Sequence, residues 1–346
     1  MRKRMNRIIK DQEPNTAIKG SARSVTILSP AKINLSIDVV GKRPDGMHEV
    51  DMVMQAIDFC DSVTVTLVPR DREEPSSCGA PDIRISCGVP EVPTDSRNIC
   101  WKAAELMLDA ARERAAGSAD ETILIDIEKR VPVAAGMAGG SGNGAAVLRA
   151  LNNLWDLGLR TEELMELGGK LGADVPFCVL AQADDTRASR HTAARARGTG
   201  TEISPVSPLS GYIVFAKPPI SVSTKEVYKG IDSCEIALRP DNERLVRELA
   251  AAWAAGPAGA AEAAAHRKAA SEEMINVLEL YTLKAEPEVA ELKALMQNEI
   301  KDAEKVLMSG SGPTVFALFG EDGKESAAAA EKLLAEAGYE AHCAAL

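Results

Sequence analysis

The sequence predicts an α+β fold of two domains. Strand patterns follow one another at the start of the chain before the first helical pattern, unlike the strict strand–helix alternation of a wound parallel sheet. A glycine-rich stretch at residues 131–144 then joins a strand to a helix, and the second half again mixes helices with strands. With 346 residues, the chain is long enough for two domains with cores of ordinary size.

The amino-acid composition is that of a soluble globular protein and excludes some functional classes. Hydrophobic residues make up 45% of the chain and charged residues 26%, as in soluble globular proteins. The formal charge of −11, from 51 acids and 40 bases, argues against a protein that coats nucleic acid. The seven cysteines include no C-x-x-C pair, and the four histidines show no ligand spacing. We therefore expect a cytoplasmic protein without a zinc site.

No segment predicts an association with membranes. The longest uncharged apolar run, residues 250–261, is short and consists mostly of alanine and glycine, so it cannot span a bilayer. Residues 1–10 are basic, but no apolar segment follows them as in a signal peptide. We expect residues 1–22 to form a disordered tail.

The first elements are strands. Residues 24–28 and 32–39 predict two strands that Pro30 separates. In the second strand, apolar residues alternate with polar ones, beginning with Lys32 and Asn34, which predicts a half-buried strand with one polar face. The simplest interpretation is that this polar face of the strand is exposed to solvent. Strand patterns resume at residues 48–58 and 63–68.

Helices and a domain junction follow. Residues 182–201 show no periodicity, and we expect a mobile excursion there that holds the domain junction, at residues 186–200. This junction would divide an N-terminal domain (23–185) from a C-terminal domain (201–346). The expected elements before it are a polar loop at 70–82, a helix at 97–116, a strand at 123–128, and helices at 145–155 and 161–171.

In the second half, the patterns predict a strand, several helices, a pair of strands, a helix and a last strand. The loop between the paired strands, residues 309–312, is either a simple hairpin turn or a second backbone surface for a polyanion. The expected elements are a strand at 212–217, a helix from 222, helices within 242–298, strands at 305–308 and 314–319, a helix at 324–337 and a strand at 339–346.

The glycine-rich stretch is the first candidate site. A glycine turn that leads into a helix exposes unpaired backbone N–H groups at the positive end of the helix dipole, which favours phosphate binding. The alternative is a tight turn in which Ser141 or Asn143 only caps the helix. No Gly-Lys-Ser/Thr follows, so it is not a P-loop. Residues 140–145 match a dinucleotide fingerprint but lie about ten residues beyond the strand, which makes nicotinamide binding the weaker alternative.

A lysine and an aspartate form the second candidate. Asp174 lies in an apolar run after the helix at 161–171, where an unpaired buried carboxylate would be costly. Either it faces water beside the helix end, or it has a cation as its partner. Lys32, on the polar strand face, could meet it beside the glycine loop. Such a pair suits phosphoryl transfer, which needs positioning, neutralisation of charge and a base for the attacking alcohol.

Four stretches resemble, in order, the motifs of the GHMP kinases. They are Pro30-Ala-Lys-Ile-Asn-Leu35, Pro132-Val-Ala-Ala-Gly-Met-Ala-Gly-Gly-Ser141, Leu171-Gly-Ala-Asp-Val-Pro-Phe177 and Met308-Ser-Gly-Ser-Gly312. Within this superfamily, Pro44-Asp-Gly-Met-His48 and Ala173-Asp-Val-Pro176 are most similar to the branch that acts on 4-diphosphocytidyl-2-C-methyl-D-erythritol in the non-mevalonate isoprenoid pathway.

The resemblance implies both a fold and a reaction. The N-terminal ATP-binding domain would be ribosomal-protein-S5-like and the C-terminal substrate domain ferredoxin-like. ATP, with Mg²⁺, would phosphorylate the 2-hydroxyl of the cytidyl-diphospho sugar alcohol. Asp174 would be the catalytic base, with Lys32 as its partner. ATP would contact Asn98, Pro132, Val133, Ala134, Ala135, Gly136, Met137, Ala138, Gly139, Gly140, Ser141 and Gly142, with Ser141 also a contact to Mg²⁺. The substrate would contact Asn34, His48, Thr224 and Tyr228, with His48 reading the cytosine and Tyr228 stacking on it.

The chain departs from the family pattern at two places. Met47 stands where the family usually has tyrosine, and a thioether can cover an aromatic face, so we expect cytosine binding to survive. Gly142-Asn-Gly-Ala replaces the usual Ser-Asn/Asp-Ala-Ala, which loosens the helix start. Open alternatives are another GHMP kinase (for mevalonate, homoserine or a sugar), a nucleotide-binding regulator and a nicotinamide-dependent dehydrogenase. We expect a monomer or a homodimer.

Overall fold

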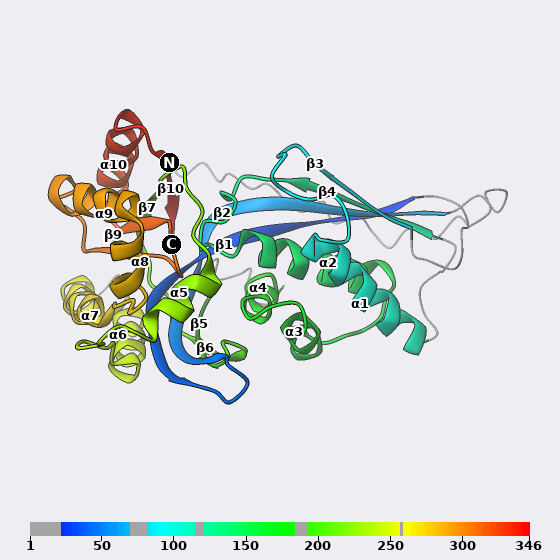
Figure 1. The fold of residues 1–346 in the computed structure, drawn as a ribbon, viewed down its shortest axis with the longest axis horizontal. Helices are drawn as coiled ribbons and strands as arrows, with labels where there is room; N and C mark the ends of the chain where they lie inside the picture. Colours follow the sequence, from blue (N-terminus) through cyan, green and yellow to red (C-terminus); the bar gives the residue numbers. More distant parts are fainter. Residues whose placement is uncertain (1–21, 70–81, 115–120, 184–191, 257–258) are drawn as a thin grey trace.

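Two β-sheets with helices packed on them make up the fold (Figure 1). The computed structural model describes residues 22–69, 82–114, 121–183, 192–256 and 259–346. Within these ranges one sheet has six strands and the other has four, so the predicted α+β class is confirmed. Almost all of the expected tail and of the polar loop at 70–82 lies outside the described residues.

Two long strands form the centre of the first sheet. β1 (Arg23–Lys42) and β2 (His48–Pro69) pair antiparallel along their whole length. Pro30 does not divide β1 into two strands, because the register shifts between Pro30 and Lys32 and a bulge accommodates the proline. β2 likewise runs without a break through the gap expected after residue 58.

The polar face of β1 is covered, in contrast to the half-buried strand that its alternating pattern predicts. Lys32 is 3% exposed and Asn34 is 1% exposed. The cause is tertiary: the glycine-rich loop bonds to the backbone of Lys32, and Ile275 and Val277 of the second domain form backbone hydrogen bonds with Ile37. The polar residues of β1 therefore lie between the two domains.

Four shorter strands complete the first sheet, with β1 paired only to β2. β3 (Asp82–Cys87) is parallel to β4 (Glu121–Glu128), which pairs with the distal part of β2. β5 (Ala193–Gly198) pairs with the first part of β2, and β6 (Glu202–Val206) pairs with β5. The order is thus β3-β4-β2-β5-β6. The sequence patterns do not predict β3.

The sequence predicts a mobile segment at residues 182–201. This prediction is wrong for residues 193–198, which form β5. Ala194 and Ala196 are buried in the core, while Arg195 forms an ion pair with Asp51 at 2.6 Å. Alternating alanine and arginine carries little hydrophobic signal, so the period of this strand is hard to detect. Because β5 and β6 belong to the first sheet, we propose that the domain boundary lies after β6 and not at residues 186–200.

Four helices cover one face of this sheet (Figure 1). α2 (Gly139–Leu154) packs on β1 and β2, with α1 (Ile99–Glu113) and α4 (Val175–Ala181) beside it and α3 (Thr161–Gly169) against α4. α2 begins within the glycines, earlier than predicted, and packs closely on α1, since a Cβ at Gly144 would lie 3.2 Å from Ile99. α4 is not predicted; Pro176 lies in its first turn, where proline is tolerated.

The second domain is built on a four-stranded antiparallel sheet. Its strands are β7 (Tyr212–Lys217), β8 (Lys305–Met308), β9 (Val315–Phe319) and β10 (Glu340–Ala345), in the order β10-β7-β9-β8. Its helices are α5 (Thr224–Ile231), α6 (Asn242–Ala255), α7 (Ala260–Glu273), α8 (Glu279–Ala285), α9 (Pro287–Glu299) and α10 (Lys324–Glu336). These elements agree with the predicted ones. Within the described ranges, every helix is too short or too polar to cross a membrane.

Aromatic residues join the two sheets. The ring of Phe59 in β2 meets Phe215 of β7 edge to face, with centroids 5.1 Å apart, and lies 4.8 Å from the ring of His342 in β10. Gln55 of β2 is fully buried and exchanges two hydrogen bonds, of 2.7 and 2.8 Å, with the backbone of Leu209. Apolar packing and hydrogen bonds together fix the second domain against β2.

Replacing Phe215 by alanine tests this junction. The residue is fully buried, and truncation of a buried phenylalanine typically costs about 3–5 kcal/mol of folding free energy. We expect chemical unfolding to show a loss of that size. Leu238→Ala, at a residue that is 68% exposed, is the control and should change stability by less than about 0.5 kcal/mol. Similar losses in the two variants would contradict this account of the junction.

Candidate active site

Lys32 is the buried centre of the site. Its ammonium donates to Asn34 Oδ1 at 2.6 Å and to the Gly136 carbonyl at 3.0 Å. Its backbone N–H donates to the Met137 carbonyl at 3.0 Å. The strand holds the lysine on one side and the glycine loop holds it on the other. The positions of the lysine and of the loop therefore depend on each other.

Asp174 supplies the opposite charge. Its Oδ2 atom lies 3.9 Å from Lys32 Nζ, and its side chain is 33% exposed. Asp174 immediately precedes α4, but its carboxylate does not cap that helix. The carboxylate thus faces the lysine on one side and remains open to a ligand on the other. The structure brings together the two residues that lie far apart in the chain.

The glycine loop leaves the start of α2 uncapped. Ala134, Gly136 and Ala138 have positive φ angles of 51°, 69° and 56°, a conformation that L-residues rarely adopt. Ala138 is the N-cap and offers no side-chain hydrogen bond, and the first helical bond runs from Gly142 N–H to Ala138 O. The helix therefore does not use the amides of residues 139–141. A turn capped by Ser141 or Asn143 is not what the structure shows.

Room for a ligand exists at this helix start. Gly140 is exposed, and a Cβ added there would meet no other atom within 4 Å. Free backbone donors, the positive end of a 16-residue helix and open space together form a suitable surface for phosphate oxygens.

A buried ion pair anchors the other end of the loop. Asp61 of β2 is fully buried, and its Oδ1 atom accepts from the N–H groups of Arg130 and Val131 at 2.7 and 2.8 Å. Its Oδ2 atom pairs with Lys129 Nζ at 2.7 Å. No sequence pattern marks Asp61 as a site residue, because a single acid in a strand gives no signal for a partner 68 residues away.

The second domain contacts the glycine loop from the opposite side. The hydroxyl of Ser309 donates to the Gly136 carbonyl at 3.1 Å, the same oxygen that accepts from Lys32. A Cβ at position 136 would lie 2.5 Å from the Ser309 carbonyl oxygen, so only glycine fits there. A Cβ at Gly310 would lie 3.5 Å from Lys32 Nζ. The two loops and the lysine are thus packed in direct contact.

Polar contacts hold the second loop, residues 309–312, which lies between β8 and β9. Asn276 is 2% exposed and donates to the carbonyls of Met308 and Gly310 at 2.8 and 2.7 Å. The hydroxyls of Ser311 and Thr224 lie 2.9 Å apart. Thr224, a predicted substrate residue, is therefore placed at this loop.

His48 and Tyr228 lie side by side at the start of β2 and on α5. Their ring centroids are 5.3 Å apart, with the planes tilted by 43°. Burial, and to a lesser extent the charge of Asp174, raises the pKa of the Tyr228 phenol, which stays neutral. Met47, next to His48, is 51% exposed. His48 and Tyr228, two of the predicted substrate residues, are thus neighbours, and the charge of Asp174 acts on the Tyr228 phenol.

Asp232, directly after α5, is a second site residue that no sequence pattern predicts. Its Oδ1 atom lies 2.6 Å from His48 Nε2, and its Oδ2 atom forms an ion pair with Lys42. Hydrogen bonds from Lys42 and His48 hold the pKa of the Asp232 carboxyl below its ordinary value. The contact joins residues 184 positions apart, and no local motif marks it.

Asn98, predicted near the adenosine, has both of its polar groups engaged by the protein. Its Oδ1 atom caps α1 by accepting from Cys100 N–H at 2.9 Å, and its Nδ2 atom donates to the Pro93 carbonyl at 2.6 Å. The structure gives Asn98 the role of fixing the segment that leads into α1.

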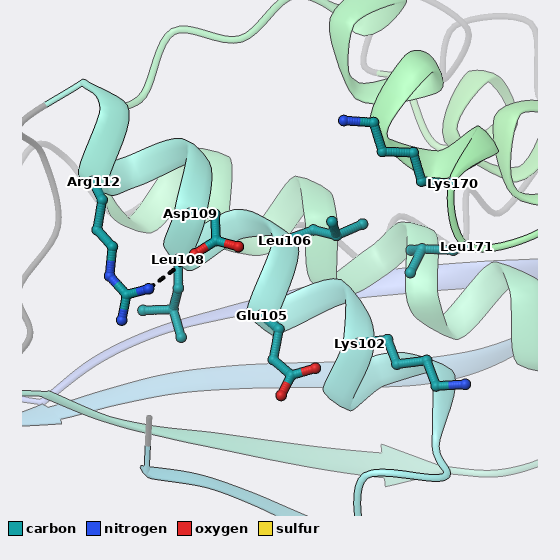
Figure 2. Close-up of a pocket in the computed structure, with 8 residues that line it drawn as sticks. All are labelled: Lys102, Glu105, Leu106, Leu108, Asp109, Arg112, Lys170 and Leu171. Carbon is teal, nitrogen blue, oxygen red and sulfur yellow. Dashed lines mark hydrogen bonds and ion pairs between the residues drawn. The ribbon is translucent and has the colours of Figure 1, made fainter. Parts of the chain in front are cut away.

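A surface pocket of about 460 Å³ lies between α1 and the segment that ends α3 (Figure 2). Within it Asp109 pairs with Arg112 at 2.9 Å. None of the predicted site residues lines it, so the pocket is distinct from the Lys32–Asp174 site. Its lining consists of Lys102, Glu105, Leu106, Leu108, Asp109, Arg112, Lys170 and Leu171.

Comparison with known proteins gives consistent matches over most of the chain. The family described as GHMP kinases N terminal domain matches residues 98–182, and GHMP kinases C terminal matches residues 241–340. Over 301 residues the chain is 43% identical to the 4-diphosphocytidyl-2-C-methyl-D-erythritol kinase of Geobacillus kaustophilus, with 87% of this chain and 90% of that protein covered. It is 39% identical to the protein of the same name from Brevibacillus brevis, with 87% and 89% covered.

Solved structures agree with these matches. A crystal structure of 4-(cytidine 5'-diphospho)-2C-methyl-D-erythritol kinase superposes with a TM-score of 0.68 at 26% identity, covering 93% of this chain and 98% of that one. A homoserine kinase from Cytophaga hutchinsonii superposes with a TM-score of 0.58 at 17% identity, covering 96% of both chains, and shares the fold.

Gly136→Ala tests the contact between the two loops. The positive φ and the 2.5 Å approach to the Ser309 carbonyl should destabilise the fold by about 1–3 kcal/mol or more. We expect a lower midpoint of chemical unfolding. Gly140→Ala is the matched control, because its Cβ meets open space; it should leave stability within about 1 kcal/mol of wild type. Equal behaviour of the two variants would contradict the packing described here.

Asp61→Asn tests the buried anchor of the glycine loop. The amide leaves the ammonium of Lys129 buried without a counter-charge, and breaking a buried pair in this way typically costs about 3–5 kcal/mol. Unfolding curves should show this loss. Asp58→Asn, at an exposed position of the same strand, serves as the control. A loss no greater than that of the control would show that Asp61 is not an anchor.

Proposed function

The chain belongs to the GHMP kinases, which are ATP-dependent small-molecule kinases, and we propose that its substrate is 4-diphosphocytidyl-2-C-methyl-D-erythritol. It would transfer the γ-phosphoryl group of ATP to the free 2-hydroxyl of this compound, within non-mevalonate isoprenoid synthesis. The names of its bacterial relatives support this substrate. The observation that carries the proposed chemistry is the Lys32–Asp174 pair beside the glycine loop. Because the chain is a GHMP kinase, the glycine loop is interpreted as an ATP-binding loop and not as the nicotinamide-binding loop of a dehydrogenase.

Asp174 is the proposed general base. As the substrate oxygen bonds to the γ-phosphorus and the bond to the leaving ADP breaks, the hydroxyl proton moves to the Asp174 carboxylate. The carboxylate is one-third exposed and has a free side from which to accept it. At their separation of 3.9 Å, and for an effective dielectric constant of about 20, Lys32 attracts the carboxylate by about 4 kcal/mol before desolvation is counted. This attraction orients the carboxylate.

The amides of residues 139–141 and the loop at 132–138 are the proposed binding surface for the ATP phosphates. ATP supplies the phosphoryl group, and Mg²⁺ would neutralise the charge of its phosphates. Mg²⁺ retains water and needs only one or two protein oxygens beside the phosphates, so the Ser141 hydroxyl, in the first turn of α2, would suit it. The described residues contain no larger cluster of metal-binding side chains.

The cytidyl end of the substrate would lie beside His48 and Tyr228, whose rings are adjacent, with His48 reading the cytosine and Tyr228 stacking on it. Asn34 and Lys32 would hold the sugar alcohol near Asp174, and Thr224 would contact it from the side of the loop at 309–312. A cytoplasmic location, and a monomer or a homodimer, complete the proposal.

Asp174→Asn tests the assignment of the base. Because an amide cannot accept the proton, we expect kcat to fall by about 10²–10⁴-fold in a coupled ADP assay with the cytidyl substrate. Calorimetry should show ATP affinity close to wild type. Asp322→Asn, an exposed aspartate in a turn, is the charge-matched control and should retain full activity.

The same assay tests the substrate. Turnover with mevalonate, homoserine or galactose in place of the cytidyl compound would overturn the proposed specificity. Near-normal turnover of Asp174→Asn with the cytidyl compound would overturn only the role of Asp174.

A further inference from the structure

Asp232 connects helix α5, which carries two of the proposed substrate residues, to the tip of the β1–β2 hairpin. α5 carries Thr224 and Tyr228, and Asp232 is the residue at its C-terminal end. Lys42 and His48 face each other in register at the end of the hairpin, and both contact the Asp232 carboxylate. One carboxylate therefore holds two strands of the first sheet against a helix of the second domain.

The contact with Asp232 determines which nitrogen of His48 carries hydrogen. An ionised carboxylate has no hydrogen to donate, so the 2.6 Å bond requires His48 Nε2 to be the donor. Lys42 balances the carboxylate charge through its own ion pair, so the contact does not require a positively charged imidazole. His48 Nδ1 is then the acceptor nitrogen, and it has no hydrogen-bond partner among the described residues.

An acceptor at His48 Nδ1 distinguishes between pyrimidine bases. Cytosine carries an exocyclic amino donor at the position where uracil carries a carbonyl acceptor. An acceptor nitrogen bonds the amino group and is repelled by the carbonyl. The side chain of His48 is 9% exposed, so an unmatched polar group beside it would lose water without gaining a partner.

We propose that Asp232 is a specificity-determining positioning residue: it fixes His48 in the Nε2–H tautomer, so that Nδ1 accepts from the amino group of cytosine and rejects uracil. This inference rests on the proposed function, since it concerns the cytidyl end of the same substrate. Tyr228, whose ring lies beside His48, provides the apolar surface against which the base would lie.

Nuclear magnetic resonance tests the tautomer independently of any activity. Long-range ¹H–¹⁵N spectra of the full-length protein would report both ring nitrogens of His48, assigned by comparison with His48→Gln. We expect the Nε2–H tautomer in wild type and a mixture of tautomers in Asp232→Ala. A wild-type spectrum showing the Nδ1–H form or the imidazolium at neutral pH would overturn the proposal, whatever the enzyme phosphorylates.

Binding of CDP and UDP, measured by calorimetry, tests the consequence. Loss of one oriented hydrogen bond should weaken CDP binding by Asp232→Ala roughly 2- to 13-fold and leave UDP binding almost unchanged. Asp232→Asn can still present an oxygen to Nε2 and should retain part of the preference. Glu49→Gln changes the same charge one residue from His48 without touching its ring, and should behave as wild type.

The outcomes separate the two proposals. An unchanged CDP-to-UDP ratio in Asp232→Ala, with thermal melts showing a folded protein, would overturn the role of Asp232. Failure of wild type to phosphorylate the cytidyl substrate would instead overturn the proposed function, while the spectra would still decide the tautomer.

Discussion

A charged amine that is almost out of reach of water must find its compensation within the protein, and in this chain that amine is Lys32. An unpaired buried ammonium is very costly, so its neighbours have to provide acceptors and a negative charge. Asn34 comes from the same strand, the Gly136 carbonyl from the glycine loop, and Asp174 from the start of α4. The groups that compensate the charge of Lys32 are thus the same groups that form the proposed active site.

The hydrogen bonds of the Lys32 ammonium require the loops of the two domains to pack closely together. The Gly136 carbonyl accepts from both Lys32 and Ser309, which belong to different domains. Two loops can share one oxygen only if their backbones approach closely, and the glycine at position 136 permits this. On the far side, the Asp61–Lys129 pair keeps the loop attached to β2. The loop is therefore fixed from three directions.

Much of this arrangement could be predicted from the sequence, and the missing parts share a cause. Local patterns, such as the glycine stretch, the helical pattern at residues 161–171 and the paired strands β8 and β9, predict the elements found there. β5 and α4 escape prediction because alanine-rich and very short segments have weak periodicity. Lys32 and Asp174 can be identified from their motifs, whereas Asp61 and Asp232 act through partners 68 or more positions away. The burial of the polar face of β1 also depends on a domain that lies later in the chain.

The unbroken course of β2 has a mechanical consequence. His48, beside the proposed base-recognition site, and Asp61, beneath the phosphate loop, belong to one strand of 22 residues that is hydrogen-bonded on both sides. An extended chain advances about 3.3 Å per residue, so the number of residues between them works as a ruler. Adding or removing one residue would change that length and turn every later side chain to the opposite face. The number of residues in β2 between His48 and Asp61 therefore sets the distance between the two ends of the site.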